Sequence, residues 1–392
     1  MTRHRTVALI VLAAIALLSL ASARDAEAIP AFARKYRMSC STCHAPFPRL
    51  KPYGNDFSNR GFRMEDPSQE PTRATYDTGD PWLQLARELP LAIRLDGYAS
   101  WKEDAAADVD FETPWSFKLL SGGPISKSIS YYVYAIIEKG ESIKLEDTFV
   151  QFNDLFGAPV RLTFGQFQVS DSLFKRELRL ERNDYAIFKT RIGILPTDLT
   201  YDRGFVLNWD APADISVVFQ LVNGNGIEEA DNDNFDDNSL KNFSARLARQ
   251  FGPVQVGLFG YWGKEELDGG PSTSITYFGP DFVVDLGEKW QLNLEYLERR
   301  DEDPFLVGRT GPDLKTTGGF AELHYFPKGQ DGRWVLSALY NKVDSDVEDA
   351  IVENASLTAS YLLARNVRLV VEGVHDLEHD GDRLSVGLIT AF

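Results

Sequence analysis

Segments in which polar and apolar residues alternate recur along most of this chain, and they constrain its fold more than any other feature. Residues 91–98, 291–296 and 356–361 each place apolar side chains at every second position. This period of two is typical of a β-strand with one apolar face. Sixteen candidate strands are present, at residues 89–102, 112–121, 129–138, 143–153, 160–169, 203–210, 214–222, 241–250, 254–264, 274–285, 289–299, 315–326, 333–343, 351–364, 367–377 and 382–392.

The candidate strands have the length and the connections of a membrane barrel. Most are close to the roughly 9 to 11 residues that a tilted strand needs to cross a bilayer. Connections such as Gly252-Pro253 and Arg365-Asn366 are short, whereas those between them, such as 228–238 and 299–313, are long and polar. An even strand number with short turns at one end and long loops at the other is typical of bacterial outer-membrane barrels, with both chain ends on the periplasmic side.

The last candidate strand, 382–392, supports the same fold because it ends in an aromatic residue, Phe392. A terminal aromatic on an alternating last strand resembles the assembly signal of outer-membrane barrels. We therefore predict a mainly β fold, a 16-stranded antiparallel transmembrane β-barrel over residues 88–392, with a small N-terminal α/coil head. A soluble β-sandwich, whose strands alternate equally well, is the alternative.

If the apolar positions face lipid, the interior of the barrel is polar. The side chains expected to point inward are those of Arg94, Asp96, Lys118, Arg161, Arg246, Glu295, Glu322 and Glu372. So many charges require water or mutual pairing. The connection 171–200 is unusually basic and is the third long loop, so we expect it to fold into the lumen, as its counterpart does in general porins.

The N-terminus has the pattern of a secretory signal. Basic residues at positions 3–5 precede an apolar run over 7–20 that ends in Ala21-Ser22-Ala23. This order predicts a signal peptide at 1–23, with cleavage as late as residue 28; a retained anchor is the alternative, although the run is short for a membrane span. The formal net charge of −17 argues against nucleic acid as a partner.

Two cysteines, the only ones in the chain, stand in the sequence Cys40-Ser41-Thr42-Cys43-His44. Cys-x-x-Cys-His is the attachment motif of haem c: two thioethers form to the vinyl groups and the histidine becomes the proximal iron ligand. A disulfide, a thioredoxin-like redox pair and a zinc site are the alternatives. The Pro-rich surroundings lack a βαβ pattern, and no further Cys or His ligand lies nearby. We predict one covalent haem c on Cys40 and Cys43, with His44 on the iron.

The distal haem ligand is less constrained by the sequence. Met64 is the predicted ligand, since methionine is a common sixth ligand of electron-transfer haems; a core methionine is the structural alternative. Met38 lies two residues before Cys40. His324 is the rival ligand, because it shares the inward parity of Glu322 at the end of its strand nearest the head. An open sixth site is also compatible.

The long loops carry most of the carboxylates. Carboxylates are hard ligands for divalent cations. Most such loops are solvated or bridge lipopolysaccharide through divalent ions, but one cluster also contains a histidine and is a candidate for transient iron(II) binding: Asp376, Glu378, His379 and Asp380.

The N-terminal segment resembles a known family. The motifs Ile29-Pro30-Ala31-Phe32-Ala33-Arg34, Cys40-Ser41-Thr42-Cys43-His44, Pro48-Arg49-Leu50 and Tyr53-Gly54-Asn55-Asp56-Phe57 resemble the haem segment of the fused outer-membrane mono-haem cytochrome c-porins, the best known of which oxidise extracellular iron(II). The resemblance implies a mono-haem cytochrome c head at 29–66, a linker at 67–87 and the porin-like barrel at 88–392.

The resemblance also implies a function. The head would sit in the barrel mouth or lumen, within the outer-membrane lipid, and electrons would pass from extracellular iron(II) to a periplasmic electron carrier such as a c-type cytochrome. This makes an iron(II)-oxidising electron-transfer oxidoreductase the expected activity. Electron export to an external acceptor and a solute porin with a haem plug are the alternatives.

Overall fold

The computed structural model describes residues 31–70, 75–83, 85–87, 90–103, 108–193, 195–227, 234–236, 238–266, 272–305 and 313–392. The predicted signal peptide, 1–23 or up to 28, lies outside these residues. Within them, no helix combines the length and the apolar character that crossing a membrane requires.

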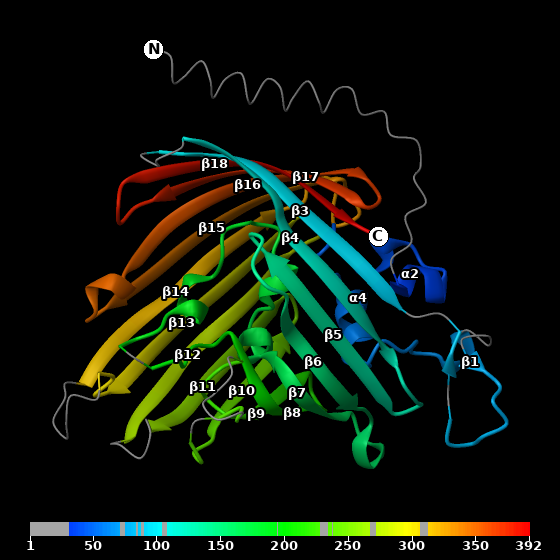
Figure 1. Cartoon of the computed structure of the whole chain (residues 1–392). Helices are drawn as coiled ribbons and strands as arrows, with labels where there is room; N and C mark the ends of the chain where they lie inside the picture. Colours follow the sequence, from blue (N-terminus) through cyan, green and yellow to red (C-terminus); the bar gives the residue numbers. More distant parts are fainter. Residues whose placement is uncertain are drawn as a thin grey trace.

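Strands β3 to β18 form one closed barrel in which each strand pairs antiparallel with its sequence neighbours and β18 closes onto β3 (Figure 1). All sixteen predicted strands are present, so the predicted fold class is confirmed. The strands are β3 (Leu91–Lys102), β4 (Val109–Pro124), β5 (Ile129–Glu138), β6 (Lys144–Phe152), β7 (Val160–Gln168), β8 (Tyr201–Ala211), β9 (Ile215–Val222), β10 (Asn242–Phe251), β11 (Val254–Glu266), β12 (Ser272–Leu286), β13 (Trp290–Glu302), β14 (Asp313–Tyr325), β15 (Trp334–Ser345), β16 (Val352–Ala364), β17 (Val367–Asp376) and β18 (Gly381–Ala391).

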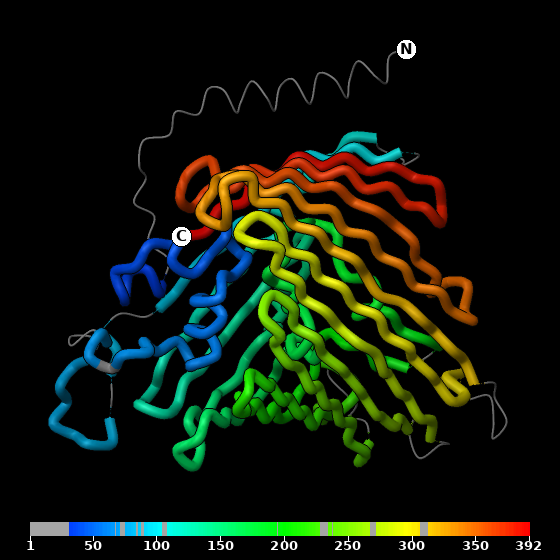
Figure 2. The backbone as a smooth tube through the Cα atoms, turned by 180° about the vertical axis from the view of Figure 1, so that it is seen from behind, coloured from blue at the N-terminus to red at the C-terminus, as the bar shows by residue number. Residues whose placement is uncertain are grey.

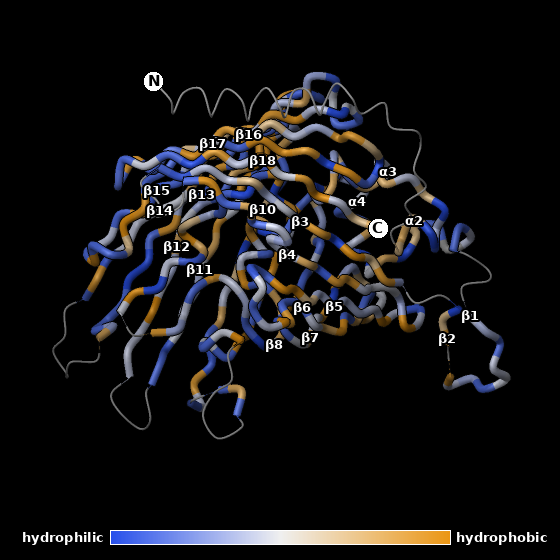
Figure 3. The backbone as a smooth tube through the Cα atoms, turned by 45° about the horizontal axis from the view of Figure 1, so that its top comes forward, coloured by the Kyte–Doolittle hydropathy of each residue, from blue (hydrophilic) through white to orange (hydrophobic). Residues whose placement is uncertain are grey.

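Alternate residues of each strand point to the inside and to the outside of the barrel, as the sequence pattern predicts. Along β14, every second residue from Thr316 to His324 is buried, and the residues between them are partly exposed. Figure 3 shows hydrophilic and hydrophobic residues alternating along the strands. The predicted inward charges are confirmed where they are buried in the lumen, and they pair as expected: Arg94 with Asp96, and Arg246 with Asp281.

The outer wall of the barrel is apolar and rich in exposed aromatic residues. Phe164, Phe278 and Leu357 are 53%, 56% and 71% exposed, and rings stack along the wall, as Phe243 does on Trp262. Trp209, Trp290, Trp334 and Tyr361 all lie near the same end, that of the short turns. Exposed apolar side chains on many strands of the wall, with aromatic residues near one end, match a lipid-facing surface.

The loop between β7 and β8, residues 169–200 without residue 194, is called the inner loop here. It contains η3 (Val169–Ser172), η4 (Arg176–Leu178) and α5 (Ala186–Lys189). Ile187 and Phe188 are fully buried, and the Tyr185 ring stacks on Phe320 of β14 with centroids 3.9 Å apart. These contacts with the inner wall confirm the prediction that this loop folds into the lumen.

One buried arginine fixes the inner loop to the opposite wall. Arg299 of β13 donates through Nη1 to the carbonyl oxygens of Thr190 at 2.7 Å and Thr197 at 3.1 Å. Its charge is matched by Asp301, whose Oδ1 accepts from Nη2 at 2.7 Å. Both side chains are completely buried, so the contact is protected from water.

The head precedes the barrel. It consists of α2 (Ala31–Tyr36), α3 (Cys40–Cys43) and α4 (Pro52–Asn59). Phe32 packs edge-on against Phe57 at 5.5 Å and stacks on Phe62 at 4.7 Å, so aromatic contacts form its small core. The predicted linker follows, with η1 (Pro67–Gln69) and a two-stranded pair, β1 (Thr75–Tyr76) with β2 (Leu85–Ala86).

The head lies at the short-turn end of the barrel (Figure 2). Arg63 donates to the carbonyl oxygen of Lys127 and pairs with Asp154 at 2.8 Å, and Lys51 pairs with Asp331. These partners belong to three of the short connections, one of which contains η2 (Leu155–Gly157). The other short helix of the connections, η6 (Glu348–Ala350), lies at the opposite, long-loop end. Contacts with several turns place the head across this opening.

Candidate functional site

The two cysteines lie on one helical turn, α3. Ser39 caps its N-terminus, where the hydroxyl accepts from the backbone N–H of Ser41 at 3.4 Å, and the N–H of His44 closes the turn on the Cys40 carbonyl at 2.9 Å. Residues three apart on a helical turn point to the same side. Burial raises the pKa of both thiols, and the two cysteines are not joined in a disulfide.

His44 is oriented by the loop that follows it. Its Nδ1 lies 3.0 Å from the Pro48 carbonyl oxygen and 3.3 Å from that of Arg49. Carbonyl oxygens only accept, so Nδ1 carries the proton and Nε2 presents its lone pair. Burial lowers the pKa of this imidazole, which keeps it in the neutral form that a metal requires. Such an outer hydrogen bond is what fixes a metal-ligating histidine.

Both thiols and the His44 ring border one cavity of about 290 Å³ between the head and the barrel. The head contributes Met38, Cys40, Cys43 and His44, and the barrel wall contributes Ile93, Leu120, Tyr132 and Phe149, among others. An apolar cavity that receives two cysteines and an oriented histidine fits haem c. The predicted haem residues Cys40, Cys43 and His44 are therefore brought together, although whether they bind haem stays a prediction.

Helix α4 lies so close to the cysteine turn that Gly54 has no room for a side chain. A methyl group on Gly54 would lie 2.4 Å from the carbonyl oxygen of Cys43. The neighbour is backbone, which cannot move aside without shifting α3.

We expect Gly54→Ala to lower covalent haem incorporation several-fold. In an ordinary helix this change stabilises by about 0.5–1 kcal/mol, but overpacking here costs about 1–3 kcal/mol and displaces Cys43. Haem staining of purified protein, per amount of barrel, measures the effect. The exposed Asn55, also on α4, provides the matched control Asn55→Ala, and equal haem content in both variants would contradict the steric argument.

The predicted distal ligand Met64 lies beside the site. The Tyr53 hydroxyl is 3.9 Å from Met64 Sδ and 3.7 Å from Met38 Sδ. Met38 is among the described residues that border the cavity, and Met64 is not. Met64 as the distal ligand therefore stays a prediction. Met38 is the methionine that borders the cavity.

His324 is fully buried and already has partners. Its Nδ1 lies 2.8 Å from Ser337 Oγ, and its Nε2 lies 3.0 Å from Glu322 Oε2 and 2.8 Å from Arg49 Nη1. It is absent from the described residues that border the 290 Å³ cavity. Its contact with the haem segment is thus made through Arg49, whose own carbonyl oxygen holds His44.

A second cavity, of about 230 Å³, lies in the lumen and is bordered mainly by charged side chains. It reaches Glu138 and Lys139 at the long-loop end of β5, and includes Glu181 of the inner loop. It shares four bordering residues with the first cavity: Arg94, Lys118, Tyr134 and Glu177. The two cavities are thus separated by only one layer of side chains.

The candidate cluster at 376–380 is exposed. Asp376 lies 3.4 Å from His379 Nδ1 and accepts from the backbone N–H groups of Glu378 and His379. In the part of the chain that the structure describes, the acidic and histidine side chains that converge as a potential metal site are others: Glu181, Glu322 and His324. The period of two along the strand predicted that Glu322 and His324 point inward. Glu181 lies in a basic loop, and no sequence pattern distinguished it.

Solved structures of similar fold include porins and other outer membrane proteins. They include an anion-selective porin from Comamonas acidovorans (TM-score 0.59, 11% identity, 78% of this chain and 99% of that chain) and the outer membrane channel DcaP of Acinetobacter baumannii (0.57, 12%, 78% and 97%). OmpF of Salmonella typhi, in complex with daunomycin, is also similar (0.56, 12%, 78% and 97%). The chain thus has a porin-type barrel fold.

The sequence comparisons add no family. No family model matches this chain, and no curated protein matches it.

Proposed function

We propose that this protein is an outer-membrane mono-haem c-type cytochrome fused to a porin-like barrel, which moves electrons from extracellular iron(II) to a periplasmic carrier. The observation that carries the proposal is the apolar cavity in which Cys40, Cys43 and the oriented His44 meet the inner wall of the barrel. Haem c bound there would supply one-electron redox chemistry.

The apolar outer wall supports a place in the outer membrane. With the short turns on the periplasmic side, as in bacterial barrels, the head lies on that side and within reach of a soluble carrier. The apolar band of such a barrel is about 25 Å tall, so a single redox centre must lie within the lumen to serve both faces. The cavity that Cys40, Cys43 and His44 share with the inner wall of the barrel supports such a position.

The chain's own side chains have separate tasks in this proposal. Phe149 and Leu120 exclude water from the cavity of the head, which favours electron transfer over side reactions. The second cavity, which is polar, brings hydrated ions to the layer of side chains between the two cavities, formed by Arg94, Lys118, Tyr134 and Glu177.

Purified full-length holoprotein tests the proposal directly. We expect haem absorbance at about 550 nm to rise when iron(II) is added, and a redox titration to give a high potential, as methionine ligation would. A haem with a low potential that iron(II) does not reduce would sink the iron(II) oxidase function and favour electron export. Absence of haem would sink the cytochrome function altogether.

A solute porin is the second candidate, and the porin-type barrel together with its polar lumen cavity favours it. The inner loop and the head, however, occupy the lumen and its short-turn opening. We therefore expect a bilayer conductance far below that of a general porin of equal strand number. A large, stable open conductance in holoprotein would favour solute transport.

A further inference from the structure

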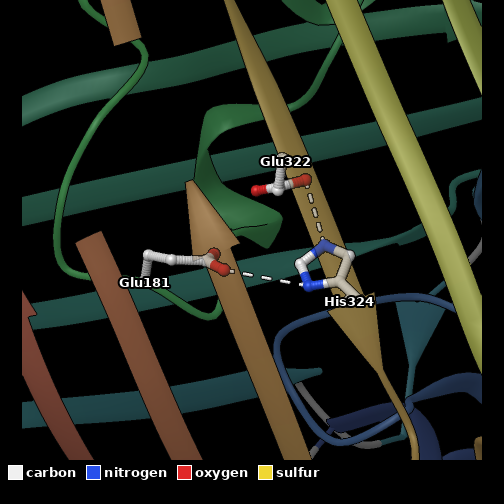
Figure 4. Close-up of side chains that lie close together, drawn as sticks. All are labelled: Glu181, Glu322 and His324. Carbon is white, nitrogen blue, oxygen red and sulfur yellow. Dashed lines mark hydrogen bonds and ion pairs between the residues drawn. The ribbon is translucent and has the colours of Figure 1, made fainter. Parts of the chain in front are cut away.

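We propose that Glu181, Glu322 and His324 form a binding site for a divalent first-row transition metal ion in the lumen, next to the haem segment (Figure 4). One ligand atom of each residue lies within 4.8 Å of the others. The role of the site, to hold iron(II), rests on the proposed function; its existence as a metal site does not.

The hydrogen bonds of His324 orient it as a metal ligand. The guanidinium of Arg49 can only donate, so His324 Nε2 accepts from it and the ring proton lies on Nδ1, where Ser337 Oγ accepts it at 2.8 Å. Nε2 therefore directs a lone pair toward the carboxylate of Glu322, whose Oε2 is 3.0 Å away. Two acceptors at this distance need positive charge beside them, which the guanidinium of Arg49 supplies here and which a metal ion would supply in its place.

Glu181 provides a second observation that points to a cation, although its Oε2 accepts from the backbone N–H of Leu180 at 3.0 Å. Its side chain is fully buried, and its Oε1 has no hydrogen-bond partner. This oxygen lies 3.8 Å from His324 Nδ1. A buried carboxylate oxygen without a donor is costly and calls for a ligand.

Charge balance favours a divalent ion. The two buried carboxylates offer the two negative charges that a divalent ion matches. Of the nearby cations, Arg49 donates to His324, whereas the guanidinium of Arg368 donates to the carbonyl oxygen of Leu180. One imidazole with two carboxylates suits iron, manganese or zinc better than magnesium or calcium, which prefer oxygen ligands alone. A metal ion on Nε2 must displace Arg49, so Arg49 acts as an internal competitor.

The position of the site suits an ion that arrives from outside. Glu181 borders the second cavity, which extends to Glu138 at the long-loop end of the barrel. On its other side, Phe326, which follows β14, packs with Ala45, the neighbour of His44. The site therefore meets the second cavity through Glu181 and the haem segment through Arg49 and Phe326.

Zinc is the probe, because it takes the same ligands but has no redox chemistry. Equilibrium dialysis of holoprotein with Zn²⁺ alone should show one tight site per chain. Glu181→Gln and His324→Gln should each weaken it on the order of 100-fold, whereas Glu138→Gln, which removes a cavity carboxylate outside the cluster, should leave it unchanged. Arg49→Gln should tighten it, by about tenfold, since a competing charge is removed.

Haem content and the mobility of unheated protein on gels show that each variant is folded. Wild-type Zn²⁺ affinity in both Glu181→Gln and His324→Gln, or weaker binding in Arg49→Gln, would overturn the site. If Zn²⁺ binds as expected but iron(II) does not reduce the haem, the site stands and the proposed function fails. If iron(II) reduces the haem but the variants bind Zn²⁺ like wild type, the function stands and the site fails.

Discussion

Replacing Cys40 and Cys43 together by alanine is expected to remove covalent haem completely. With both thiols gone, only coordination by His44 and a distal ligand can hold the haem, and coordination alone does not survive a denaturing gel. Haem staining after electrophoresis should therefore fall from one haem per chain to background. Each single variant should retain a haem held by one thioether, with the absorption maximum of the reduced form shifted to longer wavelength.

The matched control is Thr42→Ala. Thr42 is exposed on the same turn, between the two cysteines, so this change tests whether any disturbance of α3 is enough to lose haem. The barrel strands begin at Leu91, well after the motif, so unheated double-variant protein should still migrate as a folded barrel. Haem stain that persists in the double variant would rule out thioether attachment, and with it the cytochrome proposal.

The strands of this protein were predictable because each residue on them has one of two neighbours, lipid or lumen. That choice imposes a period of two on the sequence, and the terminal Phe392 and the alternating connections mark the ends. The observed strand ends differ from the predicted ones where hydrogen bonding to neighbouring strands extends a strand past its alternating segment. Strand β4 runs from Val109 to Pro124, beyond the predicted 112–121, because both β3 and β5 pair along it.

The site was predictable only where its chemistry is local. Cys40, Cys43 and His44 are adjacent in sequence, so their convergence needs no knowledge of the fold. The contact between Arg49 and His324 joins residues 275 positions apart, and parity places His324 inward without naming its partner. Glu181 reaches the same point because the inner loop crosses the lumen, a path set by contacts with Glu372, Asn341 and Glu322 on distant strands.

Removing Arg299 should both destabilise the barrel and open its lumen. In Arg299→Ala, Asp301 is left buried without a counter-charge, which costs about 3–5 kcal/mol. The carbonyl oxygens of Thr190 and Thr197 also lose their shared donor, so the inner loop is no longer fixed to β13. Urea unfolding in detergent measures the first effect, and conductance in planar bilayers, expected to rise severalfold, measures the second.

The neighbouring Arg300 is the matched control. It lies on the outside of the same strand, 68% exposed, and pairs with Glu298 at 2.7 Å. A solvent-exposed pair contributes about 0–1 kcal/mol, so Arg300→Ala should change neither stability nor conductance appreciably. Equal effects of the two variants would contradict a specific role for Arg299.

A double variant, Arg299→Leu with Asp301→Leu, separates the two effects of Arg299. Replacing a buried ion pair by apolar residues is often neutral or stabilising, so the double variant should regain most of the lost stability. It still lacks the donor to Thr190 and Thr197, and its conductance should therefore stay raised. If conductance falls back together with the recovered stability, the closed lumen depends on general barrel stability rather than on this contact, and the inner loop is held by its apolar packing around Phe188 and Tyr185 instead.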